Sequence, residues 1–131
     1  MHLGTGLRKA MALLLSLWLL NACSPEKPAV VKPTLQEIQA QRAREALRPQ
    51  DVKLAAKYSR SCLMCHTSPD AKAPLVHDRA DWQKRIAERG LDTVLSHAQI
   101  GFNAMPPQGQ CMDCSEAELK ALTRFMMGDT P

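Results

Sequence analysis

The sequence predicts an all-α protein. Apolar residues recur at helical spacing in several segments, and two of these segments begin with the capping-box pattern that marks the start of a helix. No segment alternates apolar and polar residues as a half-buried strand would. With 131 residues the chain holds at most one ordinary domain, which we place at residues 51–131.

Residues 1–22 have the pattern of a lipoprotein-type signal peptide. Arg8 and Lys9 precede an apolar run at residues 11–20, which is too short to cross a hydrocarbon core of about 30 Å. The segment ends in Leu-Asn-Ala-Cys, which resembles a bacterial lipobox, so Cys23 is the expected lipidation site. The alternative is ordinary cleavage nearby, which would leave Cys23 as a spare thiol.

Residues 23–50 are expected to tether the domain to a membrane. Acyl chains on Cys23 would hold the protein on the periplasmic side of the inner or outer membrane of a Gram-negative-type bacterium, because each buried methylene contributes about 0.8 kcal/mol. Residues 24–33 contain three prolines and predict a semi-rigid spacer. A capping box at residues 34–37 then starts a short helix, which Pro49 should end. The apolar face of this helix is thin, so we expect it to be loosely attached or to form on a partner.

Four helices are expected within residues 51–131. Asp51 supplies a side-chain cap for the first, Gly90 closes the second, and a capping box of Ser115 and Glu118 opens the last. The expected extents are residues 51–60, 82–89, 92–99 and 115–126.

The run Cys62-Leu-Met-Cys65-His66 has the C-x-x-C-H spacing. At this spacing two thiols can be linked covalently to one haem, and the adjacent histidine can ligate its iron. A thioredoxin-like cysteine pair and half of a zinc site are the alternatives. Only 4% of the chain is aromatic, so a domain of this size cannot bury a large core alone, and a covalent haem would supply apolar mass.

Met105 is the best sixth ligand of such an iron. It lies in Gly-Phe-Asn-Ala-Met-Pro-Pro, where the two prolines stiffen the backbone that follows it. His77 and His97 are rival ligands. Four other methionines are less suitable, because they lie inside a cysteine loop or on a core-facing helix: Met64, Met112, Met126 and Met127.

The two remaining cysteines, Cys111 and Cys114, suggest a short-range disulfide formed in an oxidising compartment. The alternative is a zinc ion held by four cysteines. It is weaker, because 45 residues separate Cys65 from Cys111, whereas zinc ribbons usually have about 15–20.

The charge of the chain excludes one class of partner. Residues 51–131 contain ten basic and ten acidic side chains, so the domain is neutral before any cofactor is added. No basic cluster is interleaved with stacking aromatic residues, and we therefore expect no nucleic-acid binding.

Residues 58–127 resemble the cytochrome c5 group of class I c-type cytochromes. The resemblance is carried by the C-x-x-C-H motif, Ala-Pro-Leu at residues 73–75, Trp82, the run from Gly101 to Pro107, and Cys-Met-Asp-Cys-Ser-x-x-Glu-Leu from Cys111. It implies a cytochrome c fold of three to four helices wrapped around one covalent haem c. It also implies His66 and Met105 as axial ligands and a Cys111–Cys114 disulfide near the haem edge.

Two further residues would line the haem site. Pro74 would pack behind His66 and orient its imidazole, while Trp82 would line the pocket or approach a propionate, and ordinary core packing is the alternative for both.

An iron with two strong protein ligands has no open position for a substrate. We therefore expect a one-electron carrier without turnover of its own, which docks transiently with an oxidase or reductase. The alternatives are a haem-based sensor or small peroxidase with a labile sixth ligand, and a thiol–disulfide module without haem.

Overall fold

A computed structural model describes residues 32–129. The predicted signal peptide, Cys23 and most of the proline-rich spacer lie outside the described residues, so these predictions stay predictions.

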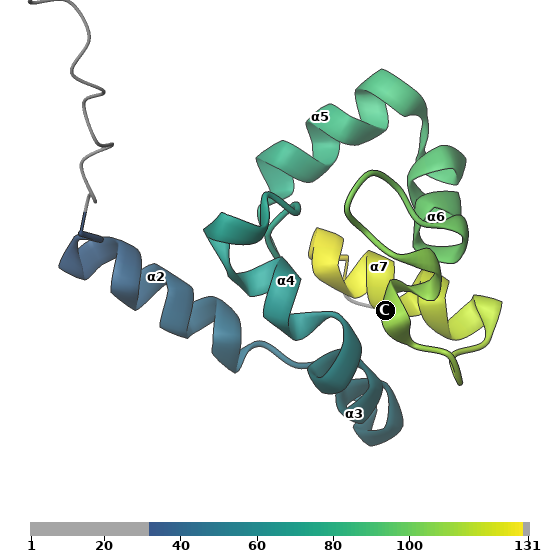
Figure 1. Ribbon diagram of the computed structural model, residues 1–131, viewed down its shortest axis with the longest axis horizontal. Coiled ribbons are helices and arrows are strands. Elements are labelled where there is room, and N and C mark those ends of the chain that lie inside the picture. The colour runs from purple at the N-terminus through teal and green to yellow at the C-terminus, as the bar shows by residue number, and fades with distance from the viewer. Residues whose placement is uncertain (1–31, 130–131) are drawn as a thin grey trace, which may run out of the picture. The chain divides into compact units, whose positions relative to one another are not determined.

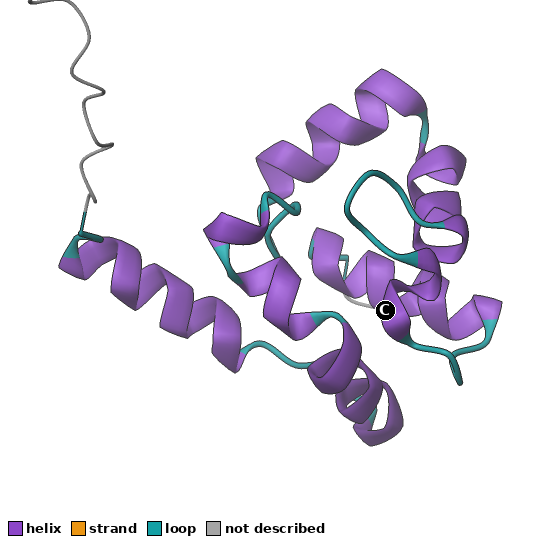
Figure 2. Cartoon of the chain, viewed as in Figure 1, coloured by secondary structure: helices purple, strands orange, loops and turns teal. Residues whose placement is uncertain are grey.

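The described residues form helices joined by loops and turns, without a strand (Figures 1 and 2). Only an isolated bridge pairs Phe102 with Met105 within this range. The predicted all-α class is therefore confirmed. The α-helices are α2 (Leu35–Ala46), α3 (Val52–Ser61), α4 (Leu63–Thr67), α5 (Arg79–Arg89), α6 (Leu91–Ile100) and α7 (Glu116–Met127), with short 3-10 turns η1 (Pro69–Ala71) and η2 (Pro107–Gln110).

Both predicted capping boxes are present. The Thr34 hydroxyl accepts a hydrogen bond from the Glu37 amide at 3.2 Å, and the Glu37 carboxylate accepts one from the Thr34 amide at 2.7 Å. Ser115 and Glu118 make the same reciprocal pair at the start of α7. Each box satisfies backbone donors that a helix start leaves without partners, which is why these two helices begin where the pattern predicts.

Two details of the predicted helices are wrong. The second helix of the domain, α5, begins at Arg79 rather than at residue 82, because the Asp78 carboxylate accepts from the Asp81 amide and caps an earlier start. The chain also forms a separate short helix, α4, directly after α3. It carries the second cysteine and the histidine of the C-x-x-C-H motif.

The core lies where α3 meets α7. Tyr58 is fully buried, and its ring meets the ring of Phe125 edge to face with centroids 5.1 Å apart. Around this pair the buried cluster continues with Val76, Trp82, Val94, Leu95, Leu122, Met126 and Met127. The first and last helices of residues 51–131, α3 and α7, therefore pack against each other in the core.

The preceding helix, α2, lies beside α4, and the linker after it reaches the core. None of its own residues is buried, but Leu47 packs against the core cluster and the Arg48 guanidinium lies 5.9 Å from the Tyr58 ring centroid. Residues from Pro33 onward form one compact unit, so α2 is grouped with the helices that follow, whereas the sequence placed the boundary after residue 50. No described helix is both long and apolar enough to cross a membrane.

Candidate functional site

The C-x-x-C-H motif lies at the junction of α3 and α4. Cys62 ends α3 and precedes α4, and its carbonyl accepts from the His66 amide at 3.0 Å. This hydrogen bond closes one helical turn, so both cysteines and the histidine project from the same turn. Neither Cys62 nor Cys65 is paired with another cysteine; the first is half-buried and the second exposed.

His66 is buried, with 5% of its surface exposed, and its imidazole has a fixed orientation. Its Nδ1 atom lies 2.7 Å from the Pro74 carbonyl oxygen. Because a carbonyl oxygen can only accept, Nδ1 donates and Nε2 keeps the lone pair that a metal needs. Burial lowers the pKa of His66, and the charge of Arg85 adds to that effect against the opposing hydrogen bond to Pro74. The imidazole is therefore held in its neutral, metal-binding form.

The segment that carries Pro74 is fixed from two sides. The Val76 amide donates to the His66 carbonyl at 2.8 Å, and the Trp82 indole donates to the Leu75 carbonyl at 2.9 Å. The Trp82 ring also lies nearly parallel to the His66 ring, with centroids 6.2 Å apart. The single side-chain donor of Trp82 is thus already used by Leu75, which makes this tryptophan a support for the segment that carries Pro74.

The unlinked thiols do not resemble a redox-active pair. Burial raises the pKa of the Cys62 thiol to about 11, and the neighbouring Cys65 contributes in the same direction. Catalytic C-x-x-C pairs depend instead on a lowered pKa, because the thiolate is the nucleophile. This chemistry disfavours the thioredoxin-like alternative.

Met105 lies in a tight turn between α6 and η2. The Phe102 amide donates to the Met105 carbonyl at 3.0 Å, and the Met105 amide donates back to the Phe102 carbonyl at 2.9 Å. Figure 1 shows this loop beside α6. Asn103 within the turn has a φ of +53°, a conformation that asparagine tolerates better than most residues.

Gly101 permits the close approach that this turn requires. Its φ is +84°, and a β-carbon built there would lie 2.8 Å from the Met105 carbonyl oxygen and 2.9 Å from the Pro107 nitrogen. Both are backbone atoms that cannot move aside alone. A side chain at position 101 would therefore displace the segment that carries Met105.

Both rival histidines have their rings packed against a phenylalanine. The exposed His77 meets Phe125 with centroids 5.2 Å apart, and the half-buried His97 stacks on Phe102 at 4.0 Å with the ring planes 13° apart. The contact between His97 and Phe102 was not predicted from the sequence, because the two residues belong to different elements.

The Cα atoms of Cys111 and Cys114 lie 5.3 Å apart, a separation within the usual range for disulfides. Two cations of α3 hold the loop between them. Arg60 pairs with Asp113, and Lys57 donates to the Asp113 carbonyl oxygen at 2.9 Å. These contacts connect the loop to the helix that leads into the C-x-x-C-H motif.

The four-cysteine zinc alternative finds no support in the described residues. The one group there of three side chains close enough to share a metal is Cys111, Asp113 and Cys114. It includes neither Cys62 nor Cys65, and its carboxylate already faces the two cations of α3.

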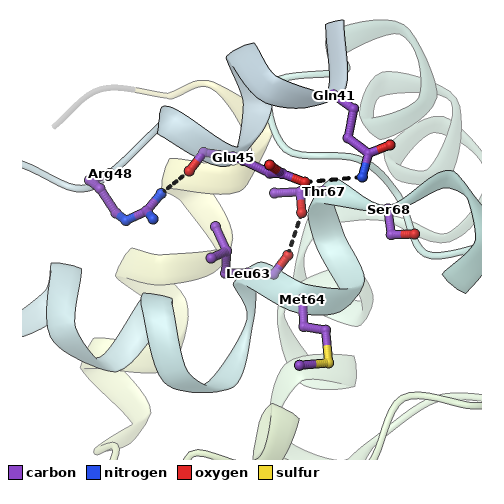
Figure 3. Close-up of a pocket in the computed structure, with 7 residues that line it drawn as sticks. All are labelled: Gln41, Glu45, Arg48, Leu63, Met64, Thr67 and Ser68. Carbon is purple, nitrogen blue, oxygen red and sulfur yellow. Dashed lines mark hydrogen bonds between the residues drawn. The ribbon is translucent and has the colours of Figure 1, made fainter. Parts of the chain in front are cut away.

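An open pocket of about 560 Å³ lies between α2 and α4 (Figure 3). Figure 3 shows Gln41 hydrogen-bonded to Glu45 at one end and Arg48 bonded to the Glu45 carbonyl at the other. The side chains of α4 that line it include Leu63 and Met64 but neither His66 nor a cysteine. The pocket is thus lined from both α2 and α4, without the cysteines and the histidine of the motif.

The residues present fit one covalently bound haem. Two unpaired thiols on one helical turn can form two thioether bonds, and a neutral imidazole with a free Nε2 follows them directly. A thioether is available from the Met105 turn. Three residues further on, the side-chain oxygen of Gln108 is buried without a hydrogen-bond partner among the described residues, and such an orphaned polar atom is compatible with a bound group nearby.

Comparisons with known proteins point to the same class. Residues 49–126 match the family model described as cytochrome c oxidase, cbb3-type, subunit III. Over 76 residues the chain is 46% identical to cytochrome c5 of Azotobacter vinelandii. This stretch covers 57% of this chain and 88% of that protein. It is 41% identical to cytochrome c5 of Ectopseudomonas mendocina over 71 residues, or 53% of this chain and 82% of the relative.

A third relative is cytochrome c-555 of Chlorobaculum tepidum, 32% identical over 57% of this chain and 72% of that protein. No solved structure matches the chain significantly.

The chain therefore belongs to this family of cytochrome c domains and, among the class I c-type cytochromes, to the cytochrome c5 group. It is a mono-haem electron carrier with covalently attached haem c.

Proposed function

We propose that His66 and Met105 are the axial ligands of this haem, that Cys62 and Cys65 attach it, and that the protein transfers single electrons between periplasmic partners. The observation that carries the proposal is the hydrogen bond between His66 Nδ1 and the Pro74 carbonyl oxygen, at 2.7 Å. It directs Nε2 of a buried, neutral imidazole away from protein acceptors and leaves it available to iron.

The bound haem c supplies an iron that alternates between the Fe(II) and Fe(III) states. The protein residues hold that iron rather than react at it. Pro74 fixes the tautomer and the ring direction of His66, and the Met105 thioether favours a higher reduction potential than a second histidine would give. With both axial positions taken by side chains no position remains for a substrate, so we propose no turnover of its own.

The proposed location is the periplasmic side of a membrane, with Cys23 as the acylated first residue. Support comes from the signal-peptide pattern of residues 1–22, from the lipobox-like sequence before Cys23, and from the bacterial cytochromes c5 to which the domain is similar. Residues 24–33 would then act as the spacer between the membrane surface and α2. An anchored carrier would meet oxidases or reductases at a raised effective concentration.

We further propose that Cys111 and Cys114 form a disulfide. The 5.3 Å separation of their Cα atoms supports this pairing, and so does the oxidising compartment proposed for the mature protein.

Optical spectroscopy tests the ligand proposal. Protein produced with haem-attachment machinery is expected to show a sharp reduced α-band, and the haem should resist acid extraction. Met105→Ala should keep the haem attached but let the reduced iron bind carbon monoxide. If Met105→Ala leaves the low-spin spectrum and carbon monoxide binding unchanged, Met105 is not the ligand. Tight carbon monoxide binding by the unchanged protein would favour the sensor or peroxidase alternative instead.

Mass spectrometry of membrane fractions tests the anchor. The mature N-terminus is expected to be an acylated Cys23, and Cys23→Ser should release the haem protein into the soluble periplasmic fraction. Cleavage at another residue, or unchanged membrane association of Cys23→Ser, would contradict the proposal.

A further inference from the structure

Phe102 is held by side chains from two different helices. Its ring stacks on the His97 imidazole of α6, with centroids 4.0 Å apart and planes inclined by 13°. The Arg89 guanidinium, at the end of α5, lies 5.3 Å from the centroid of the same ring. Parallel aromatic stacking and a cation over a ring are both favourable contacts, so the ring has a preferred position against α5 and α6.

Backbone hydrogen bonds couple the position of Phe102 to that of Met105. The two residues exchange both amide-to-carbonyl hydrogen bonds, at 2.9 and 3.0 Å, and thereby close a four-residue turn. Gly101 joins that turn directly to the C-terminal end of α6, with no room for a side chain. A displacement of the Phe102 ring would therefore shift the Met105 backbone rather than be absorbed by a flexible loop.

We propose that Phe102 is a positioning residue for the sixth ligand. Its ring, fixed by His97 and Arg89, holds the turn at the place where the Met105 thioether meets the iron. This inference rests on the proposed ligation by Met105. It also gives His97 a role other than that of rival ligand, as the surface on which Phe102 stacks.

The chain contains two phenylalanines, and Phe125 provides a matched control. It is half-buried like Phe102 and makes two ring contacts, with Tyr58 at 5.1 Å and with His77 at 5.2 Å. None of these contacts involves the Met105 turn. Phe102→Leu and Phe125→Leu therefore each remove one phenyl ring, and only Phe102→Leu should disturb the Met105 ligand.

The experiment measures carbon monoxide affinity of the reduced holoprotein and imidazole affinity of the oxidised holoprotein, together with thermal stability. Phe102→Leu is expected to bind both exogenous ligands about tenfold more tightly, the effect of losing one or two ring contacts that hold the native ligand in place. Phe102→Tyr keeps the ring and should restore affinities close to those of the unchanged protein. Phe125→Leu should lower the melting temperature but alter both affinities by less than about twofold.

Equal ligand affinities in Phe102→Leu and Phe125→Leu would overturn the inference. Met105→Ala distinguishes a failure of the proposed ligation by Met105 from a failure of the positioning role of Phe102. If Met105→Ala opens the iron but Phe102→Leu does not, only the positioning role fails. If Met105→Ala has no effect, the proposed ligation fails, and the positioning role fails with it.

Discussion

Replacing Gly101 by alanine tests how tightly the chain fits around Met105, because Gly90 offers a control with nearly the same backbone. Gly101 has φ and ψ of 84° and 161°, and Gly90 has 83° and 148°. A β-carbon is strained at both positions. It meets no atom within 4 Å at Gly90, but it would lie 2.8 Å from the Met105 carbonyl oxygen at Gly101.

The magnitudes follow from that difference. An alanine in this glycine region of the backbone costs about 1–3 kcal/mol at either position. At Gly101 the forced displacement of backbone atoms adds about 1–3 kcal/mol more, as overpacking does elsewhere. Gly101→Ala is therefore expected to lower the free energy of unfolding by about 2–6 kcal/mol, a large part of the about 5–15 kcal/mol typical of a folded domain. Gly90→Ala should lose only the first contribution.

Denaturant unfolding of both holoprotein variants measures these costs, and carbon monoxide binding to the reduced forms reports on the Met105 ligand. Gly101→Ala should be the less stable variant and the more open to carbon monoxide, while Gly90→Ala should keep the ligand affinity of the unchanged protein. Equal stability losses, with no change in carbon monoxide affinity for Gly101→Ala, would refute the reasoning from close approach.

Three further outcomes are expected. The Lys57 ammonium and the Ser115 amide lower the pKa of Glu118 to about 2. The stability that this carboxylate contributes is therefore complete above its unfolded pKa of about 4.3 and is lost as the pH falls towards 2. In Glu118→Gln the denaturation midpoint should depend less on pH over that range. Leu122→Ala removes a side chain that is 1% exposed and should lower the free energy of unfolding by about 2–5 kcal/mol in a denaturant titration. Tyr58→Phe removes a buried hydroxyl without a partner among the described residues, so the melting temperature should stay equal or rise, and a clear fall would show that the hydroxyl is bonded when haem is present.

The helix starts show what local chemistry predicts well. Thr34 and Ser115 each have a glutamate three residues later, and the pattern alone placed both starts correctly. The apolar pattern that begins at Trp82 does not include the first turn of α5, whose start is set by the cap at Asp78. An aspartate followed by an exposed first turn was the signal that would have found it.

The site was harder to predict than the helices. Covalent spacing fixes the order of Cys62, Cys65 and His66, so the motif was recognisable without a fold. The partner of His66 Nδ1 is a backbone carbonyl, that of Pro74, and such an acceptor leaves no mark in a pattern of side chains. Arg89 and Phe102 are thirteen positions apart along the chain, and only the packing of α5 against α6 brings their side chains together.

In the export proposed above, the pairing of α3 with α7 would set an order of events. The Lys57 ammonium and the Glu118 carboxylate, 2.7 Å apart in space, are separated by 61 positions in sequence, and the contact of Tyr58 with Phe125 reaches still further along the chain. A polypeptide that crosses a membrane with its N-terminus leading would present Cys62 and Cys65 well before α7 arrives. Closing such a long loop is slow compared with forming local helices. Both thiols would therefore be accessible to the attachment machinery while the fold is still open, and a chain that ends before residue 116 is expected never to close.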